Sequence, residues 1–165
     1  MKSYVPPLAG LAITLALPAA AVAEPTCRSF EATILLHMVK EGCTSPVGIC
    51  TKGTVVSSDP SLNGATWSFD SLGTAKSAGL PTLQPASMLS YAGAVVVTTS
   101  KDGTFTTTNA GVYDTEAGAF SQLDRIASGT GKFIDSKGRF IFTTGIGGGD
   151  AGFRTTVRGE LCSNP

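Results

Sequence analysis

Four cysteines are the residues of this sequence most suited to covalent or metal chemistry: Cys27, Cys43, Cys50 and Cys162. In an oxidising compartment an even number of cysteines favours disulfides, and four cysteines allow three pairings. We favour Cys43–Cys50, which closes a short loop, and Cys27–Cys162, which joins the first predicted strand to the last. The alternative is a zinc site, but the spacing contains no Cys-x-x-Cys pair and the only histidine, His37, has no partner. We therefore predict two disulfides and no metal.

Glu31 and His37 suggest an acid–base pair, because both fall on one face of the first predicted strand. Extended chain between these positions separates them by about 20 Å, which is too far for shared proton transfer. A Ser/His/Asp triad would also have to use His37, and no Gly-x-Ser-x-Gly motif accompanies it. Hydrolase chemistry is thus disfavoured, and the catalytic residues stay unknown.

A glycine-rich segment at residues 145–150 (GIGGGD) has the glycine density of a phosphate-binding loop. It lacks the Lys-Ser/Thr ending and a following helix, and Thr130-Gly131-Lys132 likewise lacks the spacing of a P-loop. The Gly-Gly-Gly-Asp run also resembles one calcium-binding nonapeptide, but a single copy cannot stack into a calcium site. We predict a loop between two strands and no cofactor.

Aromatic residues are the remaining candidates for binding, because each ring offers a large apolar surface. We expect most of them to pack in the core, and strand parity alone does not say which rings face inward. If the fold encloses a cavity, we expect Trp67, Tyr91 and Tyr113 to line it, since each combines an apolar body with a polar group. These three are the predicted ligand-binding residues.

The elements that position these residues follow a predicted secretory signal peptide at residues 1–23. Lys2 precedes an apolar run at residues 8–17, and the small residues 19–23 end in an Ala-Val-Ala cleavage site. The apolar run is shorter than the about 20 residues that cross a membrane. We predict an exported protein, periplasmic or extracellular, with no membrane span and one domain at residues 24–165.

The charge of the chain is balanced, with 12 basic and 12 acidic residues. Proteins that bind nucleic acid or anionic membranes through electrostatic attraction carry a basic excess. We therefore exclude nucleic acid as a partner.

Strict alternation of apolar and polar residues predicts the first and last strands. Asp102-Gly103, flanked by β-branched runs, predicts a hairpin, and residues 73–85, which lack periodicity, predict a long connection. The predicted strands are residues 27–40, 49–56, 65–71, 89–100, 104–108, 119–126, 132–134, 139–145 and 153–161. Helical periodicity is missing, so we predict an all-β fold, either a barrel or a sandwich.

Three segments carry a resemblance to a known family: residues 43–51 (CTSPVGICT), 129–133 (GTGKF) and 138–145 (GRFIFTTG). They resemble the bacterial exported proteins of the allene oxide cyclase barrel-like group, and more distantly allene oxide cyclases, dirigent proteins and spirotetronate cyclases. The resemblance extends from Arg28 to Cys162. It implies an eight-stranded antiparallel, calycin-like β-barrel with a central cavity for a small apolar ligand, no metal or organic cofactor, and a homo-oligomer formed through the barrel outsides.

The catalytic residues of those relatives do not align onto particular positions of this sequence, so none is transferred. The leading hypothesis is an exported barrel that binds a small hydrophobic molecule in its cavity. One alternative is a cofactor-independent isomerase or cyclase that acts in the same cavity, where orientation of the substrate supplies much of the rate. A second alternative is an extracellular structural or interaction scaffold.

Overall fold

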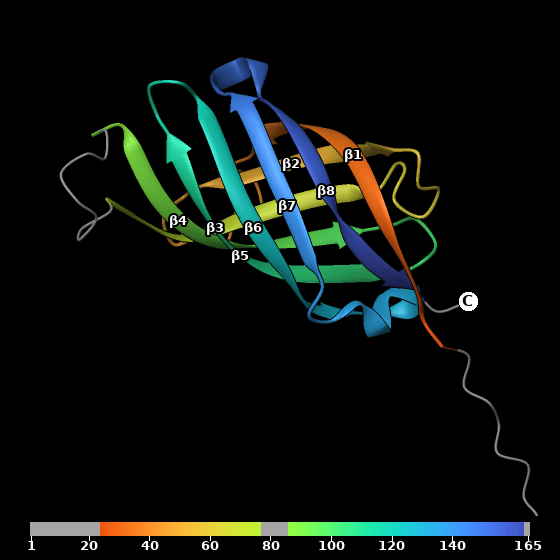
Figure 1. Cartoon of the computed structure of the whole chain (residues 1–165). Coiled ribbons are helices and arrows are strands. Elements are labelled where there is room, and N and C mark those ends of the chain that lie inside the picture. The colour runs from red at the N-terminus through yellow and green to blue at the C-terminus, as the bar shows by residue number, and fades with distance from the viewer. Residues whose placement is uncertain (1–23, 77–85, 164–165) are drawn as a thin grey trace, which may run out of the picture.

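The computed structural model describes residues 24–76 and 86–163, which form a closed barrel of eight antiparallel strands (Figure 1). Each strand pairs with the next along the chain, and the last pairs with the first. The strands are β1 (Thr26–Met38), β2 (Cys50–Ser57), β3 (Thr66–Lys76), β4 (Met88–Thr98), β5 (Thr104–Asp114), β6 (Ala119–Gly129), β7 (Phe140–Gly147) and β8 (Phe153–Ser163). Closure confirms the barrel and excludes the sandwich.

Alternation along the strands decides which side chains fill the barrel. In β1, the even-numbered residues from Phe30 to Leu36 are buried, while their odd-numbered neighbours are exposed. In β8, Val157 and Leu161 face inward in the same way. A period of two is what a curved sheet with one solvated face requires.

One end of the barrel is closed by the 3-10 helix η1 (Gly131–Ser136), which lies beside the C-terminal end of β8 (Figure 1). Phe133 of this helix is fully buried and packs edge-on against Phe105, with ring centroids 5.5 Å apart. The Ser136 hydroxyl accepts a hydrogen bond from Cys162 N at 3.1 Å and donates one to Cys162 O. The helix thus acts as a plug that β8 holds in place.

The prediction of a strand at residues 132–134 was wrong, because this segment belongs to η1. Gly131 has a φ of +58°, a left-handed conformation that turns the chain back over the barrel end. Lys132 N donates to Asp102 O at 2.8 Å, and the Lys132 ammonium lies 2.9 Å from the Asp102 carboxylate. The burial of Phe133 and these contacts with Asp102 stabilise the helix more than the short alternating pattern of residues 132–134 favours a strand.

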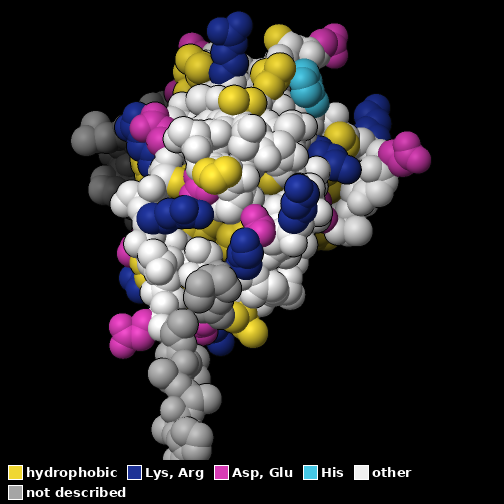
Figure 2. Space-filling view, turned by 90° about the vertical axis from the view of Figure 1, so that its right-hand side faces the viewer, with side chains coloured by type: hydrophobic (Ala, Val, Ile, Leu, Met, Phe, Trp, Pro, Cys, Tyr) yellow, Lys and Arg dark blue, Asp and Glu magenta, His cyan; other side chains and the backbone are white. Residues whose placement is uncertain are grey.

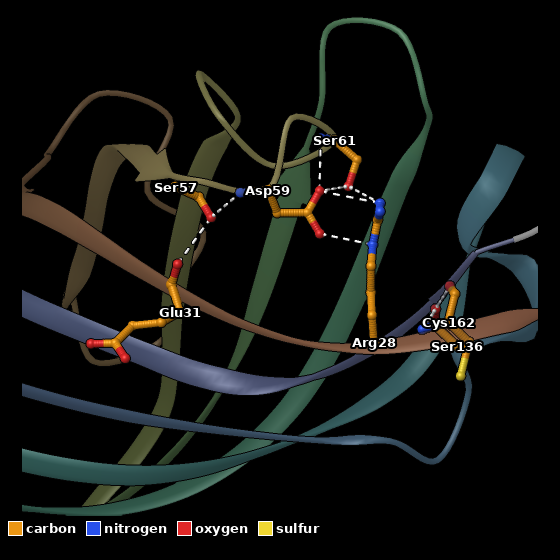
Figure 3. Close-up of polar contacts among 7 residues, drawn as sticks. All are labelled: Arg28, Glu31, Ser57, Asp59, Ser61, Ser136 and Cys162. Atoms are coloured by element: carbon orange, nitrogen blue, oxygen red, sulfur yellow. Dashed lines mark hydrogen bonds and ion pairs between the residues drawn. The ribbon is translucent and has the colours of Figure 1, made fainter.

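The half of the barrel next to η1 has a packed apolar interior. Its members are buried aliphatic and aromatic side chains from all eight strands, the β2–β3 connection and η1: Phe30, Ala32, Ile34, Val55, Leu62, Ala65, Trp67, Val95, Val97, Phe105, Ile126, Phe133, Ile141, Val157 and Leu161. We call this half the closed half. Its rim is fastened outside by Arg28, whose guanidinium lies 3.0 Å from the Asp59 carboxylate, and Asp59 also accepts from the Ser61 hydroxyl (Figure 3).

Two disulfides are present, Cys27–Cys162 and Cys43–Cys50, which are the pairings favoured from the sequence. Cys27 and Cys162 are register partners on β1 and β8 in the closed half, so this bond links the first and last strands. Cys43 lies in the β1–β2 connection and Cys50 begins β2, at the opposite end of the barrel. Each end of the barrel therefore has one covalent crosslink.

Several strands extend further than expected. β3 continues through Lys76, so the connection predicted at residues 73–85 begins later, and residues 77–85 lie outside the described residues. β5 continues to Asp114. The predicted signal peptide at residues 1–23 also lies outside the described residues. Within the described part of the chain, no helix has the length and apolar character to span a membrane.

Candidate functional site

A cavity of about 330 Å³ occupies the half of the barrel away from η1, which we call the open half. Its wall comes from residues on all eight strands, and Trp67, near the start of β3, belongs both to this wall and to the packed interior of the closed half. Six aromatic side chains dominate this wall: Trp67, Phe69, Tyr91, Tyr113, Phe120 and Phe153. The volume lies at the lower end of the about 300–1,000 Å³ typical of small-molecule sites.

Glycines on neighbouring strands make room for the aromatic rings. A Cβ atom at Gly111 would lie 2.6 Å from Cζ of Tyr91, so the Tyr91 ring lies directly over this glycine. Gly93 accommodates Phe69 in the same manner, and Gly145 accommodates Phe120. Because the rings lie against the barrel wall rather than across its centre, the interior of the open half stays hollow.

The rings also contact one another edge to face. Phe69 and Tyr91 have ring centroids 5.9 Å apart, and Phe153 lies 5.6 Å from Phe120 and 6.0 Å from Tyr113. Edge-to-face pairs of this kind contribute about 0.5–1.5 kcal/mol beyond the burial of apolar area, so each pair favours the arrangement it has here. The cavity wall is therefore a preorganised aromatic surface.

A buried carboxyl group, Asp124 of β6, lies in a layer of polar side chains between the two halves. It is fully buried and accepts hydrogen bonds from four side chains on β5, β6 and β7. Their donors are Thr107 Oγ1 at 2.9 Å, Asn109 Nδ2 at 3.1 Å, Gln122 Nε2 at 2.9 and 3.1 Å, and Thr143 Oγ1 at 3.0 Å. We call these five residues the Asp124 cluster.

Burial raises the pKa of Asp124 above its ordinary value, because a charged carboxylate is poorly solvated in the barrel interior. The four donors act in the opposite direction, led by Gln122, since they stabilise the charged form. Burial also raises the pKa of Tyr91, and the negative charge of Asp124 adds to this effect. Tyr91 is therefore a neutral phenol at any physiological pH.

Gln122 connects the cluster to the cavity. Its amide nitrogen donates to both carboxyl oxygens of Asp124, and its Oε1 accepts a hydrogen bond of 2.8 Å from the Tyr91 hydroxyl. Gln122, Tyr91 and Thr143 all line the cavity. Asn109 Oδ1 is buried and has no hydrogen-bond partner among the described residues. The polar groups at the cavity wall are thus linked to one buried carboxyl.

All three residues predicted to bind a ligand lie at this cavity: Trp67 on β3, Tyr91 on β4 and Tyr113 on β5. Their contact with a ligand stays a prediction. Glu31 and His37 are both exposed on the outer face of β1, six residues apart along the strand, and the Glu31 carboxylate pairs instead with Arg158 at 2.9 Å. The Arg158 guanidinium holds the pKa of Glu31 below its usual range.

The Asp124 cluster was not predicted from the sequence. One signal in the sequence could have revealed it. Along β6, Gln122 and Asp124 alternate with the same spacing of two as Phe120, which is partly buried, and Ile126, which is fully buried. Two polar residues on the inward face of a strand require buried partners, because an unpaired buried polar group is costly. The threonines and Asn109 on the inner faces of β5 and β7 are those partners.

The outer surface of β6 and β7 carries exposed apolar side chains, Leu123, Phe140 and Phe142, each about half exposed. The Arg125 guanidinium lies 5.3 Å from the centre of the Phe140 ring. On the face of the molecule seen in Figure 2, basic and acidic side chains are interspersed with small hydrophobic areas. The expected association of barrels through their outsides stays a prediction.

Comparison of the chain with protein-family models, characterised proteins and solved structures finds no match to any of them.

Proposed function

We propose that this protein binds a small hydrophobic molecule in the cavity of the open half. The observation that supports the proposal most is the contrast inside one barrel, where a packed apolar half adjoins an aromatic-lined void of about 330 Å³. Barrels of eight strands have room for packed side chains or for one small ligand. Here the Gly–aromatic pairs hold the larger rings at the wall, so the space for a ligand is left free.

The ligand is apolar because most of the cavity wall is apolar. Contact with Phe69, Phe120 and Phe153 removes ligand surface from water, which contributes about 25 cal/mol for each Å² of apolar surface buried. Polar groups reach the wall at few positions, and they provide orientation rather than most of the affinity.

Export from the cytoplasm is part of this proposal. The predicted signal peptide and the two disulfides support an extracytoplasmic location, since disulfides persist in oxidising compartments. We also propose that the chain is a member of the allene oxide cyclase barrel-like group, and the closed eight-stranded antiparallel barrel is compatible with this membership.

A second candidate function is that of a cofactor-independent isomerase or cyclase acting in the same cavity. The observation that favours it is the buried carboxyl of Asp124, which is linked through Gln122 to the Tyr91 hydroxyl at the cavity wall. A carboxyl group with a raised pKa is suited to proton transfer. Conversion of a bound molecule to an isomer of equal mass would distinguish this function from binding alone.

Native mass spectrometry of the protein purified from its culture medium tests the proposal. We expect an apolar compound at near-stoichiometric amount in the wild type, identified in an organic extract of the same sample. Leu89→Trp should lose this compound, because Leu89 lines the cavity and the larger ring would fill it. The matched control is Leu72→Trp, since Leu72 is 59% exposed on the adjacent β3.

Two results would contradict the proposal. If the wild-type protein carries no compound and takes up none from lipid extracts, the scaffold alternative is favoured. If both tryptophan variants retain the compound equally, it binds outside the cavity.

A further inference from the structure

We infer that the ligand carries a hydroxyl group, which donates a hydrogen bond to the Tyr91 phenol oxygen at the cavity wall. This inference rests on the proposed binding function and narrows its ligand class to apolar alcohols or phenols, in preference to the matching ketones, ethers and hydrocarbons. It follows from the direction of each hydrogen bond between Asp124 and the cavity.

The first step is the set of donors around Asp124. Five hydrogen bonds from four side chains point at the two carboxyl oxygens, with lengths of 2.9–3.1 Å. At a pH above the raised pKa of Asp124, its carboxylate only accepts hydrogen bonds, so each neighbour then turns a hydrogen toward it. The Thr143 hydroxyl therefore donates its only hydrogen to Asp124 Oδ2.

The second step is the orientation of Gln122. Its amide nitrogen lies 2.9 and 3.1 Å from the two carboxyl oxygens, and the reverse orientation would place its carbonyl oxygen against them. Two oxygens without a hydrogen between them repel each other, so the network fixes the amide nitrogen toward Asp124. Gln122 Oε1 consequently points to Tyr91.

The third step is the Tyr91 hydroxyl. Because it donates its only hydrogen to Gln122 Oε1 at 2.8 Å, its oxygen has lone pairs left and no hydrogen to give. The same holds for Thr143 at the cavity wall. A ligand carbonyl or ether oxygen placed here would meet lone pairs, whereas a ligand hydroxyl would find an acceptor.

Asn109 Oδ1 is a further acceptor of the Asp124 cluster, although Asn109 is not one of the residues that line the cavity. It is a buried acceptor without a donor among the described residues, so the cluster has more acceptors than hydrogens. Gly111 holds the Tyr91 ring in place, which fixes the position of the phenol oxygen relative to the wall. The cluster and the ring together form an acceptor site in an otherwise apolar cavity.

Three probes of matched shape test the inference: trans-2-decalol, trans-2-decalone and trans-decalin. Trp67 lines the cavity and is the only tryptophan of the chain, so its fluorescence reports entry of each probe. We expect the alcohol to bind about tenfold more tightly than the ketone, as one gained hydrogen bond predicts. Titration calorimetry with the full mature protein provides the second readout.

Two variants should reverse or remove the preference for the alcohol over the ketone. Gln122→Met frees the Tyr91 hydrogen to donate into the cavity, so the ketone should bind as tightly as the alcohol or more tightly. Tyr91→Phe should weaken alcohol binding about tenfold and leave decalin binding unchanged. Thr108→Val is the matched control, because it removes a hydroxyl that is exposed on the outer face of β5, and it should keep the wild-type preference.

The outcomes separate this inference from the proposed function. A wild-type protein that binds all three probes with equal affinity, or prefers the ketone, overturns the inference and leaves hydrophobic binding in place. Failure of all three probes to bind overturns both. If Gln122→Met does not fold, the comparison of Tyr91→Phe with Thr108→Val still tests the inference.

Discussion

The two halves of the barrel are built from the same eight strands with the same alternation, yet one is packed and the other is hollow. In the closed half, β-branched and aliphatic side chains such as Val95, Ile126 and Val157 project to the centre and meet, and Phe133 covers the end. In the open half, rings lie over glycines of the next strand, and the centre stays empty.

The comparison shows that alternation decides which side chains enter the barrel. In the open half, glycines on the next strand also let the rings of Phe69, Tyr91 and Phe120 lie against the wall, which leaves the centre free. The Asp124 cluster lies between the halves and supplies four donors to its own carboxyl, so it ends the apolar core without leaving Asp124 unpaired.

Removal of the two disulfides should affect the halves unequally, and this is the largest effect we expect. Cys27→Ser/Cys162→Ser opens a crosslink that spans 135 residues, and Cys43→Ser/Cys50→Ser opens one that spans 7. The chain-entropy model gives losses of about 5 and about 2 kcal/mol in the free energy of unfolding. Urea unfolding of both variants measures the difference.

Alkylation supplies the control for that experiment. The native protein should resist labelling at all four cysteines until it is reduced. If the two double variants lose equal stability, the long crosslink Cys27–Cys162 contributes no more to stability than the short crosslink Cys43–Cys50, which would contradict the prediction.

Truncation of one aromatic residue in each half tests whether only one half is a packed core. Phe133→Ala should lower the free energy of unfolding by about 3–5 kcal/mol, because Phe133 is fully buried among core residues. Phe120→Ala should cost less than half as much, since one side of the Phe120 ring already faces the cavity. Comparable losses in urea unfolding would argue that the open half is equally packed.

The Gly–aromatic pairs can be tested at Gly111. Gly111→Ala should destabilise the protein by about 1–3 kcal/mol and weaken ligand binding, because the new methyl group displaces the Tyr91 ring. Gly73→Ala is the matched control, since a Cβ atom there has no neighbour within 4 Å. Thermal unfolding and Trp67 fluorescence give the two readouts, and a neutral Gly111→Ala would contradict the role of this glycine.

The pH dependence of stability is the smallest effect and tests the layer between the halves. Because the pKa of Asp124 is raised in the folded protein, the folded state binds a proton more tightly than the unfolded chain. Its contribution to stability is present below the ordinary Asp pKa of 3.8 and is lost as pH rises through the raised folded pKa. Asp124→Asn should therefore gain stability relative to wild type as pH increases.

Paired urea titrations of wild type and Asp124→Asn across the acid range measure that change. A stability difference that does not vary with pH would show that the four donors cancel the effect of burial completely.

Alternation and turn chemistry were sufficient to predict the strands of an all-β fold, because both are local, but they left a barrel and a sandwich open, and the barrel was implied by the family resemblance. The first and last strands and the hairpin at Asp102-Gly103 follow from residue parity and from one turn motif. The continuation of β5 through Asn109 and Gly111 was missed, since both residues are rare in strands and their reasons are non-local. The helix η1 was missed because packing of Phe133 on the barrel end overrides its short extended pattern.

The lining of the cavity was predicted only in part, because some of its residues are recognised by chemical type and others only by their partners on neighbouring strands. Trp67, Tyr91 and Tyr113 could be selected by chemical type alone, since amphipathic rings suit a cavity wall. In the sequence, Asp124 and Gln122 have the residue types of surface positions. Burial of Asp124 in the barrel is possible because threonines on β5 and β7 donate hydrogen bonds to its carboxyl group. A partner set spread over three strands cannot be recognised from one strand's pattern.

Backbone amide NMR during titration with trans-2-decalol tests the central claim most directly, because it reports on both halves at once. The account predicts chemical-shift changes at Tyr91, Tyr113 and Gln122 in the open half, and none at Phe105 and Phe133 in the closed half. Changes centred on the outer-face residues Phe140 and Phe142, or spread evenly through both halves, would contradict a ligand site in the open half.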